Sequence, residues 1–403
     1  MKKIALHWQI LIALVLSVIF GIYFKEYISY VSWMGEIFLR ALKMIIIPLI
    51  LSSIVSGVTN IGNAENLGRL GLKTITYYIA TSTFAILTGL FLVNIIQPGI
   101  GADLNLSSKV EGLAEGRTLS ETLIYIIPDN IFGSFSDNSQ MLSVIFFAII
   151  FGFFITRVTT KHKVILSDFF SAIFDVMMKV TLFIIKFTPF GIFGLVAEQV
   201  AEQDDLLSLI QSMGLYMLVV LLALFIHAFI TLPLIIKILG RINPMKHINA
   251  VKTPLLTAFS TSSSSATLPL TIEAVEHNSG VSNKISSFTL PLGATINMDG
   301  TALYECVAVM FIAQAYGYDM SFIQQIIIVV TALLASIGAA GIPMAGLIMI
   351  TIILTAVGLP LEGVGLILAV DRILDMFRTA TNVWSDSCGA VLIAKSEGEK
   401  LKV

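Results

Sequence analysis

Long apolar runs recur along the chain, and short polar segments separate them. The clearest runs cover residues 10–20, 45–51, 84–96, 144–155 and 217–230. A helix of about 20 apolar residues crosses the hydrocarbon core of a bilayer, so the pattern predicts an all-α polytopic membrane protein. Pro128, Pro189 and Pro233 are expected to mark kinks or helix ends. We expect helices at about 5–24, 30–58, 68–97, 120–158, 163–195, 208–240, 283–314 and 362–395.

Two segments of the C-terminal half are apolar at both ends and broken in the middle. The first, about 248–276, contains the hydroxyl-rich run Ser260–Thr267. The second, about 320–358, contains Gly338, Gly341, Pro343 and Gly346. Each apolar arm is too short to cross about 30 Å of hydrocarbon. Non-helical backbone at membrane depth is tolerated where it is buried in protein or lines a wet cavity. We therefore predict two re-entrant hairpins of an inverted-repeat transporter; two ordinary loops are the alternative.

Composition and charge refine this prediction. The chain is 56% hydrophobic and 12% charged, with a mean hydropathy of +0.92. Basic residues gather at both termini and in alternate loops, whereas the loop Glu198–Asp205 has only acidic charges. The positive-inside rule then predicts an even number of spans and cytoplasmic termini in a cell membrane, inner or plasma. We expect lipid surroundings, no nucleic-acid partner, and free buried thiols at Cys306 and Cys388.

A charged stripe interrupts the last apolar segment. Its members follow one another at steps of 4, 3, 4 and 4 residues, so they share one face of a helix: Asp371, Asp375, Arg378, Asn382 and Asp386. Charges at membrane depth cost several kcal/mol unless they are paired or line a wet cavity. The stripe therefore predicts a functional site, with the solvated face of a soluble helix as the alternative. Arg378 has the donor geometry for a carboxylate, while Asp375 either pairs with Arg378 or accepts from a substrate ammonium.

A second polar interruption lies at Asn297-Met-Asp-Gly300, inside an otherwise apolar span. Asn, Asp and Gly compete with helical hydrogen bonds, so the run favours local unwinding that frees backbone carbonyls. Carbonyl and carboxylate oxygens suit a hard cation such as Na⁺. Asp299 and Asp386 are therefore candidate cation ligands; a simple glycine kink is the alternative.

Four motifs together resemble the glutamate transporter family, the dicarboxylate/amino acid:cation symporters. They lie at Ser263–Pro269, Leu290–Ala302, Ala335–Pro343 and Leu374–Asp386, and the resemblance covers nearly the whole chain in the family's order. It implies eight transmembrane helices plus two re-entrant hairpins. It also implies a homotrimer in which a transport domain moves like an elevator against a fixed scaffold.

The resemblance also implies a division of the chain. Scaffold helices 1 and 2 would occupy 1–66, and helix 3 of the transport domain 67–97. An extracellular loop and scaffold helices 4 and 5 would occupy 98–207. The rest of the transport domain, 208–403, would contain the hairpins at about 244–276 and 320–358.

Site residues follow from the same resemblance. Arg378 would hold the substrate's side-chain carboxylate, Asp375 its amino group, and Asn382 with the first hairpin tip its α-carboxylate. The implied substrate contacts are Ser262, Ser263, Ser264, Thr301, Ile342, Gly346, Asp375, Arg378, Thr379 and Asn382. The three implied sodium sites are Gly293, Asn297, Asn382 and Asp386; Thr295, Ser336, Ile337 and Ala339; and Tyr78, Thr81, Ser82, Asn297 and Asp299. For the hydroxyls of Tyr78, Thr81 and Ser82 on helix 3, ordinary helix packing is the alternative to sodium binding.

Three positions bear on ion coupling. Ser262 and Met376 stand where prokaryotic and animal members, respectively, carry an arginine, so K⁺ counter-transport is left open. Glu305 stands where animal members have a proton-carrying glutamate. A buried carboxyl can bind a proton near neutral pH, so Glu305 is a candidate H⁺ carrier; an ion pair with a nearby arginine is the alternative.

The expected function is a secondary symporter, not an enzyme, that takes up glutamate or aspartate with Na⁺, with H⁺ as a second candidate ion. A C4-dicarboxylate carrier would leave Asp375 without an ammonium, and a neutral amino acid or cystine carrier would leave Arg378 without a carboxylate. A membrane enzyme or channel is disfavoured because the five histidines are scattered and no nucleophile–base pair is evident.

Overall fold

The computed structural model describes residues 6–62, 69–102, 124, 127–136, 140–202, 206–338 and 345–403, and all regular structure in them is helical. The first half contains α1 (Leu6–Tyr23), the 3₁₀ turn η1 (Lys25–Tyr30), α2 (Ser32–Gly62), α3 (Arg69–Ile96), α5 (Ile131–Ser136), α6 (Met141–Ile155), α7 (Thr160–Ile185) and α8 (Thr188–Glu202). The second half contains α9 (Leu206–Ile226), the π-helical turn η4 (His227–Thr231), α10 (Leu232–Gly240), α11 (Pro244–Ala250), α12 (Lys252–Thr261), α13 (Ser264–Ala274), the π-helical turn η5 (Val275–Ser279), α14 (Asn283–Ile296), α15 (Asp299–Ala315), α16 (Phe322–Gly338), α17 (Ala345–Ala356) and α18 (Val364–Ser396).

Several helices are long and apolar enough to cross a membrane. Four qualify within the described residues: Ser32–Thr59, Arg69–Ile96, Ile210–Gly240 and Asn283–Ala315. The pair Thr160–Ile185 and Thr188–Glu198 makes a fifth if the two helices form one bent span. The prediction of an all-α multi-pass membrane protein is confirmed, and the count of eight spans stays a prediction.

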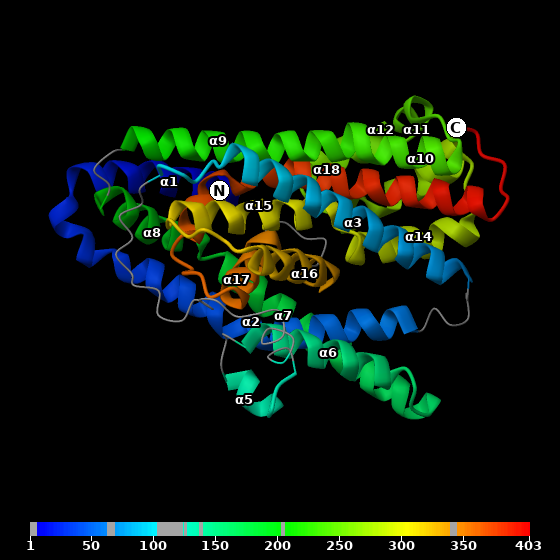
Figure 1. Ribbon diagram of the computed structural model, residues 1–403, viewed down its shortest axis with the longest axis horizontal. Helices are drawn as coiled ribbons and strands as arrows, with labels where there is room; N and C mark the ends of the chain where they lie inside the picture. Colours follow the sequence, from blue (N-terminus) through cyan, green and yellow to red (C-terminus); the bar gives the residue numbers. More distant parts are fainter. Residues whose placement is uncertain are drawn as a thin grey trace, which may run out of the picture.

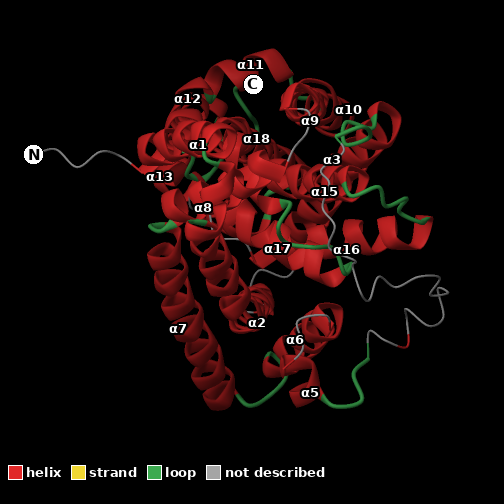
Figure 2. Ribbon diagram, turned by 90° about the vertical axis from the view of Figure 1, so that its left-hand side faces the viewer, coloured by secondary structure: helices red, strands yellow, loops and turns green. Residues whose placement is uncertain are grey.

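The helices form two groups that contact each other; Figures 1 and 2 show α2, α5, α6 and α7 on one side of the molecule, whereas α1 and α8 lie beside α18. In one group α2 contacts α6, α7 and α8, and α1 packs along α8. In the other group α15 is central, because it contacts α3, α9, α16, α17 and α18. The helices α16 and α17 touch both groups, since each contacts α2 as well as α15.

Two predicted helices differ from the observed ones. The single helix expected at about 120–158 is wrong, because α5 and α6 are separate and α6 begins only at Met141. The helix expected at about 163–195 is divided into α7 and α8, which are bent by 54°, and this agrees with the kink or helix end expected at Pro189. The bend directly precedes Pro189, which cannot donate a backbone hydrogen bond and so favours a break there.

The first broken segment turns back as predicted. Ser262 ends α12 in the left-handed region, with φ +51°, and the side chain of Ser263 accepts the N–H of Ala266 to cap α13. The second broken segment consists of α16 and α17, and its tip, 339–344, lies outside the described residues.

An ion-pair cluster joins the start of α3 to the end of α18. Glu397 lies 2.7 Å from Arg69 and 2.6 Å from Lys73. Hydrogen bonds from these two side chains hold the pKa of Glu397 at about 2. A carboxyl with a lowered pKa stabilises the fold above its unfolded value, near 4.3, and that stabilisation is lost as the pH falls toward the folded value.

We expect Glu397→Gln to lower the melting temperature of the purified protein at neutral pH. The difference from the wild type should shrink as the pH falls from about 4.3 toward 2, because Glu397 then loses its charge in both states. Thermal melting over a pH series measures this, with Glu26→Gln, an exposed residue of η1, as the matched control. A difference independent of pH would contradict the assignment.

Candidate functional site

The charged stripe lies on one 33-residue helix, α18, which contacts α9, α12, α14 and α15. Its five members are all buried, from 0% exposure at Asp371 to 6% at Asp375. The shared face predicted from the sequence is therefore an interior face, and the alternative of a solvated helix face is excluded.

Arg378 is the centre of the first part of this face, between Asp371 and Asn382. Its Nη2 lies 2.8 Å from Asp375 Oδ1 and 3.1 Å from Asp371 Oδ1. Its guanidinium lies over the ring of Tyr304, 3.8 Å from the ring centroid. The Tyr304 hydroxyl donates to Asp371 Oδ1 at 2.7 Å. The position and charge of Arg378 are thus fixed by two carboxylates and one aromatic ring.

Two nitrogens of the guanidinium have no protein partner among the described residues. Nε and Nη1 of Arg378 are buried, and neither makes a hydrogen bond within the described part of the chain. A Cβ on Gly346, at the start of α17, would lie 2.7 Å from Nη1, so the second hairpin reaches this nitrogen. Each unsatisfied buried donor costs about 1–3 kcal/mol. A carboxylate placed beside Gly346 would satisfy the Nη1 donor with a charge-assisted hydrogen bond.

A second polar cluster forms where the seventh predicted helix breaks. α14 ends at Ile296 and α15 starts at Asp299, so the predicted unwinding is confirmed at Asn297 and Met298. Asp299 is fully buried and accepts hydrogen bonds from Ser82 and Ser385, each at 2.6 Å. Thr81 Oγ1 lies 3.3 Å from oxygens of both Asn297 and Asp299.

The third carboxylate, Asp386, lies beside this cluster. Asn297 Nδ2 donates to Asp386 Oδ1 at 2.9 Å. A Cβ on Gly293 would lie 2.5 Å from that oxygen and 2.7 Å from the Tyr78 hydroxyl, so α14 can approach α18 only with glycine here. The Tyr78 hydroxyl donates to the carbonyl of Thr289 at 2.7 Å.

The structure thus brings together the residues predicted for two sodium sites. Among the described residues, no lysine or arginine pairs with Asp299 or Asp386. Carboxylate, amide and hydroxyl oxygens gathered without a fixed cation suit a hard metal ion. The donor chemistry therefore fits Na⁺.

Asn382 links the two clusters. Its Oδ1 accepts the N–H of Gly300 at 2.7 Å, and its Nδ2 donates to Thr301 Oγ1 at 3.0 Å. It lies one turn of α18 from both Arg378 and Asp386. The start of α15 is therefore bonded to the residue that joins the two halves of the stripe.

The first hairpin tip also meets this region. α12 and α13 both contact α18, and Phe259 packs edge-on against Phe377 at 5.0 Å. Ser262 and Ser264 are buried, and Ser262 Oγ has no hydrogen-bond partner in the described chain. Thr379 is buried on α18 with an exposure of 5%. The tip therefore offers a buried donor of the kind predicted for the substrate.

The remaining predicted residues are less well placed. In the expected second sodium site, Thr295 is exposed and donates to Leu292, while Ser336 is buried and donates to Leu333. Ile337 lies at the end of α16. Ala339 and Ile342 lie outside the described residues, so this site and that substrate contact stay predictions.

Glu305 is fully buried in α15. Neither of its carboxyl oxygens has a hydrogen-bond partner within the described residues, and no ion pair involves it there. The alternative of an ion pair with a nearby arginine is therefore not observed.

Sequence reasoning missed three contributors. His227 Nε2 lies 3.0 Å from Asp299 Oδ2, although the histidines were expected to be scattered. The π-helical turn η4 holds it there, fixed by the Trp384 indole, which donates to the carbonyl of Ala228 at 2.8 Å. Ser385 and Tyr304 were not predicted either. An ionisable residue within an apolar span was the available signal for His227.

Comparison with known families fits this geometry. The model of the sodium:dicarboxylate symporter family matches residues 6–396. The chain belongs to this family. It is a family of membrane transporters, which agrees with the multi-pass helices and the interior polar face.

Relatives extend over almost the entire chain. Excitatory amino acid transporter 3 of Mus musculus is 36% identical, covering 98% of this chain and 87% of the relative. A proton/sodium-glutamate symport protein of Geobacillus stearothermophilus is 38% identical, covering 99% and 96%. A proton/glutamate-aspartate symporter of Escherichia coli K12 is 36% identical, covering 98% and 93%.

Proposed function

We propose that this symporter takes up glutamate or aspartate, driven by the Na⁺ gradient. The observation that carries the proposal is the pair of neighbouring sites on α18. Within the described residues, Arg378 offers two buried donors that have no protein partner, and Asp299 and Asp386 have no lysine or arginine partner. The names of two relatives, a proton/sodium-glutamate symport protein and a proton/glutamate-aspartate symporter, support the same substrate class.

The charges of Arg378 and Asp375 also distinguish between a neutral substrate, a C4-dicarboxylate and an acidic amino acid. A small neutral substrate would leave Arg378 Nε and Nη1 unsatisfied, which costs about 1–3 kcal/mol for each donor. A C4-dicarboxylate would satisfy Arg378 but would bring no ammonium group to Asp375. An acidic amino acid supplies both groups, with its α-carboxylate directed to Asn382 and the first hairpin tip.

We propose further that the protein is a homotrimer working as an elevator. Residues 1–66 and 98–207 would form the scaffold, and residues 67–97 and 208–403 the moving domain. The arrangement of the helices in two groups, with contacts between the groups made by α16, α17 and α18, supports this division. K⁺ counter-transport is not part of the proposal.

The function is tested by uptake into liposomes that contain the purified protein, under imposed Na⁺, H⁺ and K⁺ gradients. Labelled aspartate and glutamate should accumulate only with an inward Na⁺ gradient. Unlabelled acidic amino acids should compete, whereas succinate and alanine should not. Equal accumulation in choline and in sodium would refute the proposal.

We propose H⁺ as a second coupling ion, carried by Glu305. A carboxyl that is fully buried without a donor is far less costly when neutral than when ionised. Protonation would therefore let the moving domain cross the membrane with less buried charge.

Glu305→Gln is expected to make uptake independent of pH and to abolish H⁺ movement with substrate. Uptake by proteoliposomes over a pH series, at fixed Na⁺, measures this. Glu362→Gln, at an exposed position beyond α17, is the matched control and should keep the wild-type profile. A Glu305→Gln protein that folds poorly but keeps the wild-type pH profile would mark Glu305 as structural.

A further inference from the structure

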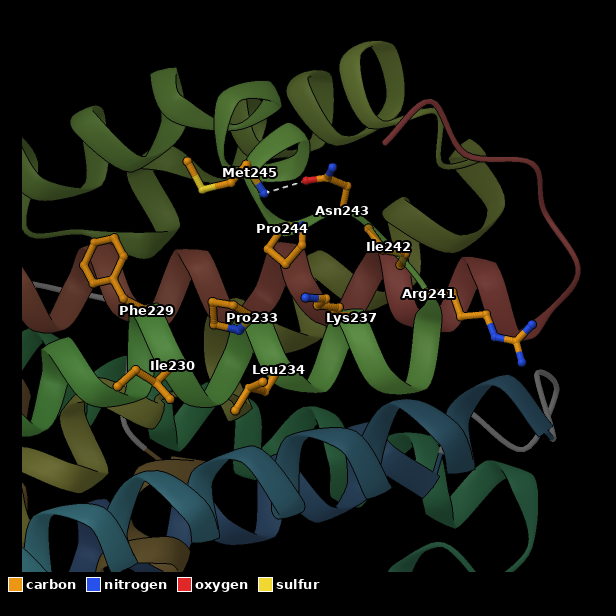
Figure 3. A pocket seen from close by; sticks show the side chains of 10 residues that line it. All are labelled: Phe229, Ile230, Pro233, Leu234, Lys237, Arg241, Ile242, Asn243, Pro244 and Met245. Carbon is orange, nitrogen blue, oxygen red and sulfur yellow. Dashed lines mark hydrogen bonds between the residues drawn. The ribbon is translucent and has the colours of Figure 1, made fainter.

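A groove away from the stripe lies along α10 and the turn that follows it (Figure 3). It has a volume of about 660 Å³ and is lined by Phe229, Ile230, Pro233, Leu234, Lys237, Arg241, Ile242, Asn243, Pro244 and Met245. The groove lies at the C-terminal end of Ile210–Gly240, which is long and apolar enough to cross a membrane.

One end of the groove is apolar and open to the surroundings. Phe229 is 54% exposed, Ile230 48% and Leu234 47%. Ile230, Leu234 and Lys237 follow at steps of 4 and 3 along η4 and α10, so they lie near one face, and Arg241 comes directly after α10. An exposed apolar wall on a membrane helix suits a hydrocarbon chain.

The other end carries hydrogen-bond donors, and Figure 3 shows the Arg241 guanidinium pointing away from Lys237 and Asn243. Lys237 and Arg241 are exposed, and neither has an ion-pair partner among the described residues. The Asn243 side-chain oxygen accepts the N–H groups of Met245 and Lys246, at 3.0 and 3.2 Å. Its Nδ2 amide therefore stays available as a donor. None of the residues that line the groove is acidic, so the groove complements an anion.

Arg241 occupies a backbone position that favours glycine. It ends α10 in the left-handed region, with φ 52° and ψ 34°, and its N–H bonds to the carbonyl of Ile236. Glycine is the usual residue at such a helix end, since a side chain there is strained. The arginine therefore opposes local backbone preference, and a ligand for its side chain would account for that.

We infer that this groove binds an anionic glycerophospholipid. The phosphate would be bound by Lys237, Arg241 and the Asn243 amide, and an acyl chain would lie along Phe229, Ile230 and Leu234. Arginine and lysine are the usual phosphate-binding side chains, and basic pockets at membrane boundaries bind lipid headgroups. The proposal concerns a site apart from the transport site and does not depend on which substrate is carried.

Native mass spectrometry of the delipidated protein, titrated with phosphatidylglycerol, tests the site. Lys237→Gln combined with Arg241→Gln should weaken the tightest binding about tenfold or more. The combination Lys246→Gln and Lys252→Gln removes the same charge from exposed positions outside the groove and should leave that binding unchanged. Equal loss in both double variants would mean general attraction to a basic surface and would overturn the proposal.

Arg241→Gly separates a ligand role from a structural one. Because glycine suits the left-handed position, the variant should melt at a higher temperature than the wild type in lipid-free detergent. It should also lose most of the further rise that phosphatidylglycerol gives the wild type. A lower melting temperature together with an unchanged lipid effect would mark Arg241 as structural. Inorganic phosphate should not reproduce the lipid effect; if it does, the groove is a site for a free anion and not for a lipid.

Discussion

Arg378→Ala is expected to weaken the binding of aspartate and glutamate by roughly 1.5–3 kcal/mol, or about 10- to 100-fold, the contribution of hydrogen bonds to a charged group. The guanidinium is held by Asp371, Asp375 and the Tyr304 ring, and two of its nitrogens have no partner among the described residues. The variant removes the guanidinium of the one arginine among the five residues of the interior face of α18. Isothermal titration in saturating Na⁺ measures the loss.

Two further variants sharpen this result. Arg378→Lys keeps the positive charge but loses the planar fork, so its affinity should fall between the wild type and the alanine variant. Arg372→Ala makes the same chemical change one turn before Met376, at a half-exposed position 3.8 Å from Asp375, and should have a small effect. Aspartate affinity that is unchanged in Arg378→Ala would exclude this arginine as the carboxylate partner.

Stability has to be measured beside binding. Without Arg378, Asp371 and Asp375 are buried carboxylates that lack their closest cation, and breaking a buried pair costs about 3–5 kcal/mol. Melting temperature and size-exclusion profile identify variants that fail to fold. Binding of a neutral amino acid by Arg378→Ala would show that the remaining site is intact.

Asp299→Asn is the second change with a large expected effect. In the wild type, Na⁺ should raise substrate affinity by a factor of about 5 to 150, a usual range for coupled sites. Asp299 accepts hydrogen bonds from Ser82 and Ser385 and has His227 within 3.0 Å. Asparagine keeps the shape but removes the charge that a cation needs. The affinity of Asp299→Asn should therefore depend only weakly on Na⁺.

Asp386→Asn should flatten the sodium dependence in the same way, since Asp386 lies beside Asn297 and Gly293. Asp168→Asn, at an exposed position of α7, is the matched control and should retain the wild-type dependence. Because coupling is reciprocal, substrate should raise Na⁺ affinity by the same factor. Substrate titrations at several Na⁺ concentrations measure this, and a steep dependence that survives both variants would place the cations elsewhere.

The sequence predicted the long elements well and their interruptions in part. The break at Asn297 follows from residue types that compete with helical hydrogen bonds, so local chemistry was enough. The stripe on α18 follows from periodicity alone. The separation of α5 from α6 was not predicted, because an apolar run shows where a helix can form but not where a loop replaces it.

By itself, the sequence determined the membrane class, the two broken segments and the common face of Asp371, Asp375, Arg378, Asn382 and Asp386, because these depend on hydropathy and helical period. Only the tertiary structure decided which partners meet that face. His227 lies 72 positions before Asp299, and Ser82 lies 217 before it. Contacts across such separations depend on how whole helices pack, and periodicity within one helix carries no information about its neighbours. The same packing left two nitrogens of Arg378 without a partner among the described residues, and this supports the proposal that the stripe is a binding site and not only a buried ion pair.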